Sequence, residues 1–271
     1  KKIVENYMKL NNLNLRLGEF NQIHLDAISE YTIQELNWSL NTHCKFMMDL
    51  LQIFKYAVKL KRLPASVFSE MAFDTRREET DSIYLTEDEI LQLQEVADFD
   101  DPEQELVRDV FVIGCFTGMR FSDYSVFDPA EIRDNRLSFI QSKTGKKVTI
   151  PIHSRVNTIL KKYDYKLPLV PPNNKFNEVI KKVGEKLPCL HVPFTKQITY
   201  KREQTEIVRM KYEYLQTHTA RRSFCSNEYL KGTDPIIIMA MSGHKSHKSF
   251  MRYIKVSNEQ FADKMAKIWQ E

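Results

Sequence analysis

Six side chains between residues 120 and 253 have the chemistry that phosphoryl transfer requires. They are two arginines, two histidines, one lysine and one tyrosine: Arg120, Lys143, His218, Arg221, His244 and Tyr253. An arginine guanidinium is a planar fork that can hold two phosphate oxygens at once. A tyrosine hydroxyl has an ordinary pKa of about 10, and nearby cations favour its ionised, nucleophilic form. The set therefore indicates attack by a tyrosine on a phosphate that is held between cations.

The spacing of these residues predicts how they are positioned. His218 and Arg221 are three residues apart, so they share one face at the beginning of a helix, where the helix dipole favours an anion. Lys143 lies at the expected tip of a hairpin, where it can reach a DNA groove. Arg120 follows directly after a buried helix, and His244 follows a glycine.

Each of these motifs is weak alone, and two assignments have competitors. Lys146 and Lys147 share the turn with Lys143, and a small shift of the hairpin would favour one of them. Tyr229 and the tyrosines at 212 and 214 compete with Tyr253, but none follows Gly-His at a useful spacing. The hypothesis therefore rests on the whole set, because its members occur together and in order.

Helical periodicity dominates the elements that must position these residues. Apolar residues recur at helical spacing over residues 40–58, and a shorter helix is expected over 25–36. Thr86 and Glu89 form a capping box, which predicts a helix start. Residues 105–117 are apolar nearly all round and predict a buried helix that ends at Gly118. Further helices are expected at 173–187, from 218 onward, from 235 to 242 and in the C-terminal tail.

Two short hairpins interrupt the helices. The sequence NRLSFIQSKTGKKVTIPI predicts two strands around a Lys-Thr-Gly-Lys turn, and residues 198–215 predict a second hairpin. The expected fold class is therefore mainly α with small β-hairpins (α+β). A helical domain is expected over residues 1–70, a polar linker over 71–83, and a larger domain with a C-terminal tail helix over 84–271.

Composition sets only broad limits. The chain of 271 residues carries a formal net charge of +4, a mild preference for anionic partners. No apolar run reaches the ~18 residues that cross a bilayer. No carboxylate cluster has metal-ligand spacing, so we expect no metal and no cofactor. Four scattered cysteines predict free thiols in a reducing compartment: Cys44, Cys115, Cys189 and Cys225.

The ordered set Arg, Lys, His-x-x-Arg, Gly-His and Tyr resembles the catalytic domain of the tyrosine recombinases, also called the phage-integrase family, over roughly residues 83–257. The resemblance implies that Arg120 and Arg221 clamp the scissile phosphate and that Tyr253 forms a 3′-phosphotyrosyl link. It implies that Lys143 protonates the leaving 5′-hydroxyl, that His218 supports the nucleophile by acid/base action and that His244 hydrogen-bonds a phosphate oxygen. Asp123 matches an acidic position of the family that orients the site.

The resemblance also implies partners. They are double-stranded DNA, three further copies of the chain in a tetramer on DNA, and a possible DNA-bending accessory protein. The N-terminal domain resembles the family's core-binding domain, with backbone contacts expected from basic residues: Lys55, Lys59, Lys61, Arg62 and, in the larger domain, Arg222. The chain does not begin with Met, so we expect an upstream arm-binding domain and favour a mobile-element integrase, acting in the cytoplasm at the nucleoid. The apolar stripe of the tail helix leaves packing in cis and in trans equally open.

Three other functions compete with this one. A type IB topoisomerase shares the Arg, Lys, His and Tyr chemistry but only relaxes supercoils. A non-catalytic DNA-binding regulator of the same fold would have lost a member of the set, and all are present here. A phosphohydrolase using His218 and Arg221 would leave Arg120, Lys143 and Tyr253 unexplained.

Overall fold

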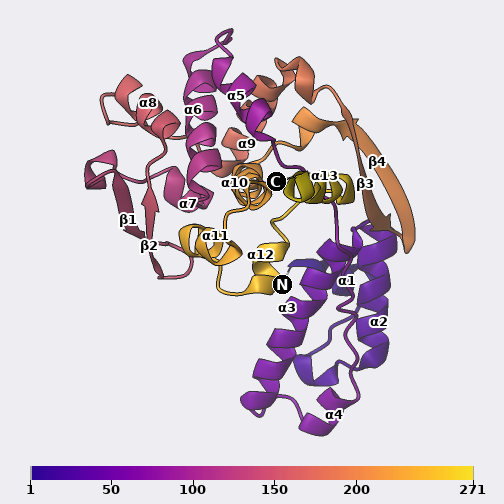
Figure 1. Ribbon diagram of the computed structural model, residues 1–271. Helices are drawn as coiled ribbons and strands as arrows, with labels where there is room; N and C mark the ends of the chain where they lie inside the picture. The colour runs from indigo at the N-terminus through magenta and orange to yellow at the C-terminus, as the bar shows by residue number, and fades with distance from the viewer. Residues whose placement is uncertain (1, 271) are drawn as a thin grey trace. The chain divides into compact units, whose positions relative to one another are not determined.

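The computed structural model describes residues 2–270 and confirms a mainly helical fold with two small antiparallel hairpins (Figure 1). The chain divides into two compact units. The first comprises residues 1–81 and 195–208, and the second comprises 82–194 and 209–271. Along the described residues, the chain therefore passes between the units after positions 81, 194 and 208.

The first unit contains four helices and most of the second hairpin. Its helices are α1 (Lys2–Leu10), α2 (Gln22–Glu30), α3 (Leu40–Lys59) and α4 (Ala65–Ser69). The helix expected at 25–36 begins earlier, at Gln22, because Asn21 caps it, and it continues as a π-helical turn over Tyr31–Glu35. Leu25, Ile28, Met47 and Phe54 are among the residues that form the unit's apolar core.

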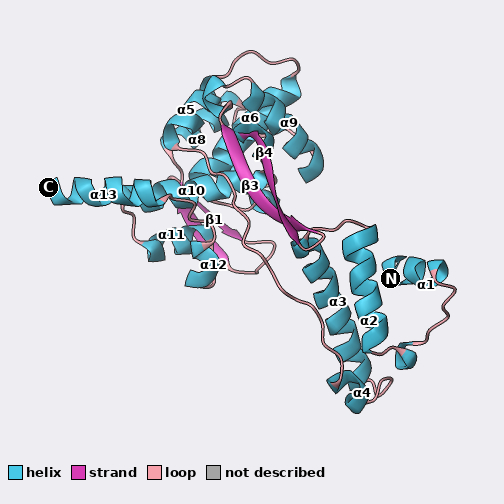
Figure 2. Ribbon diagram, turned by 90° about the vertical axis from the view of Figure 1, so that its right-hand side faces the viewer, coloured by secondary structure: helices cyan, strands magenta, loops and turns pink. Residues whose placement is uncertain are grey.

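The hairpin of β3 (Pro193–Tyr200) and β4 (Glu203–Met210) is the long ribbon of Figure 2. Its outer part is attached to the first unit by polar contacts. Arg202, in the turn between the strands, forms an ion pair with Glu30 at 2.6 Å. Thr199 donates to the Glu78 carboxylate from its backbone N–H (3.0 Å) and its hydroxyl (2.6 Å). The hairpin was predicted from the sequence, but these contacts with residues 30 and 78 were not.

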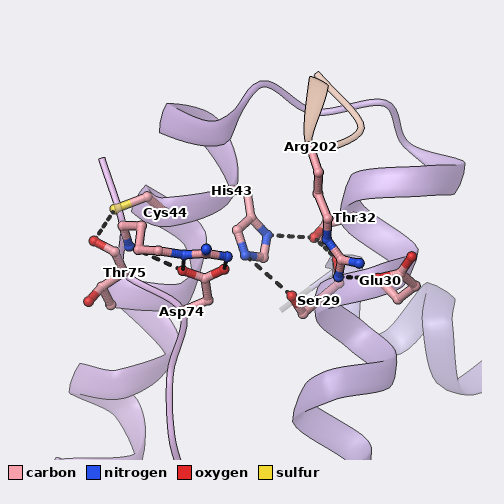
Figure 3. Close-up of polar contacts among 9 residues, drawn as sticks. Ser29, Glu30, Thr32, His43, Cys44, Asp74, Thr75 and Arg202 are labelled. Carbon is pink, nitrogen blue, oxygen red and sulfur yellow. Dashed lines mark hydrogen bonds and ion pairs between the residues drawn. The ribbon is translucent and has the colours of Figure 1, made fainter. Parts of the chain in front are cut away.

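The segment that the sequence analysis interpreted as a linker contains no helix or strand, but its first part is bound along α3. The Cys44 thiol donates to the Thr75 carbonyl oxygen at 3.2 Å (Figure 3). Beside it, the fully buried His43 lies 2.8 Å from the Thr32 hydroxyl, and burial lowers the pKa of His43. Residues 71–81 thus form part of the first unit.

The second unit is built around α6 (Pro102–Thr117), which is buried nearly all round and packs against α5, α8, α9 and α10. Its other helices are α5 (Glu87–Glu95), α7 (Phe121–Tyr124), α8 (Ser154–Lys162), α9 (Asn173–Glu185), α10 (Thr217–Lys231), α11 (Pro235–Ser242), α12 (His247–Met251) and α13 (Asn258–Gln270). The predicted capping box is present: Thr86 and Glu89 begin α5. Strands β1 (Arg136–Ile140) and β2 (Lys147–Pro151) pair antiparallel, with Leu137 opposite Ile150.

The first half of α13 contacts Tyr229 of α10, and large apolar side chains are exposed further along the helix. The Lys264 amine donates to the Tyr229 carbonyl at 2.5 Å, and Phe261 packs on the Tyr229 ring. Further along, Ile268 and Trp269 are exposed. No helix within residues 2–270 is long and apolar enough to cross a membrane. All four cysteines are unpaired, as the sequence predicted.

Gly118 shows how tightly α6 is packed at its end. It closes the helix with a left-handed φ of +65°, and an added Cβ would fall on the Phe224 ring of α10. Gly232 closes α10 with a φ of +90°, but nothing lies within 4 Å of its Cβ position. We expect Gly118→Ala to lower the free energy of unfolding by about 2–4 kcal/mol, from backbone strain and overpacking together. Gly232→Ala carries only the strain, about 1 kcal/mol.

Denaturant unfolding of the two variants checks this difference. Equal losses would contradict the close packing of α6 on α10.

Candidate active site

Arg221 is the most buried part of the site. It lies on α10 with no exposed surface, and its Nη1 donates to the carbonyl oxygens of Gly118 (2.7 Å) and Ser242 (2.6 Å). These carbonyls lie at the C-terminal ends of α6 and α11, where the helix dipole is negative. Burial lowers the pKa of Arg221, but a guanidinium stays charged. Two helix ends therefore compensate the cost of burying this cation.

His244 lies against Arg221, directly after α11. Its Nε2 is 3.1 Å from Nη2 of Arg221, and its Nδ1 is 2.8 Å from the Ser242 hydroxyl, which donates to the Ile238 carbonyl at 2.6 Å. This pattern assigns the proton to Nδ1 and leaves the Nε2 lone pair facing the guanidinium. Burial, and then the charges of Arg221 and Arg120, lower the pKa of His244 to about 3.

Tyr253 follows α12 and joins the same cluster. Its ring centroid lies 4.6 Å from that of His244 and 5.3 Å from Cζ of Arg221. Its backbone is held in place because its N–H donates to Phe250 (2.7 Å) and its carbonyl accepts from Ser226 of α10 (3.1 Å). The ring is half-buried. A single chain thus brings the tyrosine, the histidine and the arginine together.

Arg120 is joined to the cluster through Gln141. It precedes α7, is half-buried, and donates from Nη1 to Oε1 of Gln141 at 2.7 Å. Gln141 was not among the predicted site residues, although the sequence carries a signal for it. Residues 137, 139 and 141 alternate onto one face of the first hairpin, and a glutamine there is a polar residue on a buried face.

Lys143 and His218 lie at the exposed edge of the site. Lys143 occupies the turn between β1 and β2, as the sequence predicted. His218 is in the first turn of α10 and is exposed, whereas Arg221 on the same helix is buried. Partial desolvation lowers the pKa of His218, and the charges of Arg222, Arg221, Lys143 and Arg120 lower it further. All four cations therefore disfavour the protonated form of His218.

Two more predicted residues stabilise the surroundings of the site. Asp123 is buried on α7 and accepts from the Ser142 N–H at 3.0 Å, so it fixes the turn that carries Lys143. Arg222 donates to the Ile83 carbonyl at 2.9 Å and thereby ties α10 to the segment before α5. This contact gives Arg222 a structural role, and its binding to DNA stays a prediction.

The four other basic residues predicted to bind DNA belong to the first unit and take no part in this cluster. They are exposed at the end of α3 and just after it: Lys55, Lys59, Lys61 and Arg62. Within residues 2–270, no group of three or more His, Cys, Asp or Glu side chains is placed to hold a metal ion.

Comparison with known proteins identifies the family. Residues 84–260 match the phage integrase family, and this stretch contains all six side chains of the predicted set. The chain therefore belongs to the phage integrase family and is a tyrosine site-specific recombinase. No curated protein sequence shows significant similarity to the chain.

Solved structures share the fold at low sequence identity. XerH recombinase bound to palindromic difH is 17% identical, with a TM-score of 0.63, over 98% of this chain and 76% of that one. The Tn1549 transposon integrase with circular-intermediate DNA is 15% identical, with a TM-score of 0.62, over 96% and 91%. A lambda integrase tetramer on a Holliday junction is 17% identical, with a TM-score of 0.60, over 93% and 70%.

The low pKa of His244 predicts a pH-dependent stability. Its folded pKa of about 3 lies below the unfolded value near 6.5, so the unfolded chain binds an extra proton between these values. Stability is therefore complete above pH 6.5 and falls below it, by at most about 1.4 kcal/mol per pH unit for this group. His244→Gln keeps a donor and an acceptor but cannot titrate. Between pH 6.5 and 5.5 this variant should therefore lose about 1 kcal/mol less unfolding free energy than wild type does.

Unfolding free energies at the two pH values test this. His247→Gln, at an exposed histidine of α12, is the control and should follow wild type. If His244→Gln also follows wild type, His244 is not held neutral by the fold.

Proposed function

We propose that this recombinase cleaves DNA by attack of the Tyr253 hydroxyl on a phosphodiester, which leaves a 3′-phosphotyrosyl link and a free 5′-hydroxyl. The observation that carries the proposal is the Tyr253 ring over the buried guanidinium of Arg221, with His244 beside both. The P–O5′ bond breaks as the P–O(Tyr) bond forms. A 5′-hydroxyl of a second strand can then reverse the step, so religation needs no ATP and no cofactor.

The surrounding cations supply the remaining chemistry. Arg120 and Arg221 neutralise the charge that develops on the phosphate oxygens. Among the described residues, Nε of Arg221 is a buried donor without a partner, and it can donate a hydrogen bond to an incoming phosphate oxygen. Lys143 protonates the leaving 5′-oxygen, and His218, whose pKa is lowered by partial burial and then by the cations around it, accepts the tyrosine proton.

His244 hydrogen-bonds a phosphate oxygen in this proposal. That contact needs a proton on Nε2, whereas in the DNA-free site the proton is on Nδ1 and Nε2 faces Arg221. The tautomer therefore exchanges when DNA binds. Asp123 holds the Lys143 turn during the reaction.

The proposal extends to the wider setting of the reaction, for which the family and the similar structures give support. Integration or excision of a mobile element, at the nucleoid in the cytoplasm, is the setting we propose, and the fold shared with a transposon integrase is consistent with the mobile-element part of it. A tetramer of lambda integrase on a Holliday junction supports action as a homotetramer on two DNA sites, with or without a DNA-bending accessory protein. A topoisomerase that only relaxes supercoils needs no pair of specific sites, so dependence on two sites distinguishes recombination from relaxation.

A covalent-capture experiment tests the nucleophile. Wild type, incubated with a pool of nicked duplexes whose central positions are randomised, should form an adduct that survives a denaturing gel, and sequencing the captured DNA gives the site. Tyr253→Phe should bind the selected duplex but form no adduct, because it lacks the attacking oxygen. Tyr229→Phe, which alters a partly buried tyrosine of α10, should form the adduct at the wild-type level. An adduct with Tyr253→Phe would disprove the proposal.

The basic end of α3 has a separate test. If Lys55 and Lys59 each contact a backbone phosphate, the binding constant of the Lys55→Ala/Lys59→Ala variant should depend less on salt. The slope of its logarithm against log salt should become less negative by about 2, near 0.9 for each lost contact. Fluorescence anisotropy between 50 and 200 mM salt measures the slope. The control removes two exposed charges of the second unit, Lys161→Ala/Lys166→Ala. Equal slopes in both double variants would rule out a special role for α3.

A further inference from the structure

The Gln141 side chain is a buried polar group with hydrogen-bond partners at both its amide oxygen and its amide nitrogen. It is 1% exposed and follows the end of β1. Its Oε1 accepts from Arg120 (2.7 Å) and from the Thr144 hydroxyl (2.7 Å), and its Nε2 donates to the Ser242 carbonyl at 3.1 Å. A buried amide with partners on both ends is held in one orientation, because any rotation leaves a buried group unpaired.

The Ser242 carbonyl makes this amide a link between the two arginines. The same oxygen accepts from Arg221 at 2.6 Å. Arg120, the Gln141 amide, the Ser242 carbonyl and Arg221 thus form one continuous hydrogen-bonded row. The distance between the two guanidinium groups is therefore set through Gln141.

Gly243 leaves the space that this row requires. Its φ is +69°, which favours glycine, and a Cβ at this position would fall on the side chain of Gln141. The glycine before His244 thus has a second task besides closing α11, since it lets the amide approach the Ser242 carbonyl.

The backbone of Gln141 also closes the turn that carries Lys143. Its N–H donates to the Lys146 carbonyl (3.0 Å), and its carbonyl accepts from the N–H of Gly145 (2.9 Å). The turn and the two arginines are therefore positioned by the same residue.

We propose that Gln141 is a positioning residue for DNA cleavage: it sets the spacing of Arg120 and Arg221, so that both guanidinium groups meet one phosphate. The inference rests on the proposed function and adds to it a residue that does not itself touch the DNA. Reacting groups that are misplaced by about 1 Å lose on the order of 100-fold in rate.

The test compares cleavage rates on the duplex selected by covalent capture, at saturating protein. Gln141→Met keeps the volume but removes the amide, so it should bind DNA as wild type does and cleave about 10- to 100-fold more slowly. Gln94→Met is the matched control, because the Gln94 amide also accepts from an arginine, Arg155 at 3.1 Å, but lies outside the site. It should cleave at the wild-type rate.

A substrate change separates positioning from general damage. A methylphosphonate at the scissile position removes the oxygen charge that the arginines neutralise, so the deficit of Gln141→Met should shrink to a few-fold on it. Should the Met variant not fold by thermal melting, Gln141→Glu replaces it. This variant keeps the size and the acceptor but loses the donor to Ser242, and it should show the same shrinking deficit.

Three results would overturn the inference. A wild-type cleavage rate for the Gln141 variant overturns the inference and leaves the proposed function standing. A deficit of the same size on both substrates does the same, because it would mean general damage. Failure of wild type itself to form an adduct overturns the proposed function and this inference with it.

Discussion

The buried guanidinium of Arg221, held by carbonyls at the C-terminal ends of α6 and α11, is the interaction on which the rest of the site depends. A cation without exposed surface is tolerated only where negative groups surround it. The two helix ends provide them, and each end is closed by a left-handed glycine, Gly118 or Gly243. Arg221 thereby fixes the two helix ends relative to α10.

The other reactive groups are placed by the elements that meet at this point. Arg120 lies three residues after the end of α6, so the same helix end that binds Arg221 also positions Arg120. His244 follows α11 directly, and Tyr253 follows α12. The charge of Arg221 then acts on both rings: it adds to the effect of burial in lowering the pKa of His244, and it lies over the face of Tyr253, where a cation is favoured.

The sequence predicted the parts of this arrangement that depend on residue type and local spacing. Arginine, histidine and tyrosine in this order predicted the family, and Gly118, Thr86 and the Lys-Thr-Gly-Lys turn marked element ends. Long-range contacts were not predictable in this way. The carbonyls that hold Arg221 carry no side-chain signal, and Gln141 became functional only because the first hairpin meets the end of α11. The attachment of residues 195–208 to the first unit depends on pairs such as Arg202 and Glu30, which are far apart in the sequence.

The covalent link itself gives the most direct test of this account. The captured adduct is digested with nuclease and trypsin, and the peptide that retains a nucleotide is sequenced by mass spectrometry. Trypsin cuts after Arg252 and Lys255, so the account predicts the nucleotide on the tripeptide of residues 253–255, at the Tyr253 oxygen. A nucleotide on any other tyrosine would contradict the assignment of the nucleophile, and with it the role given to Arg221.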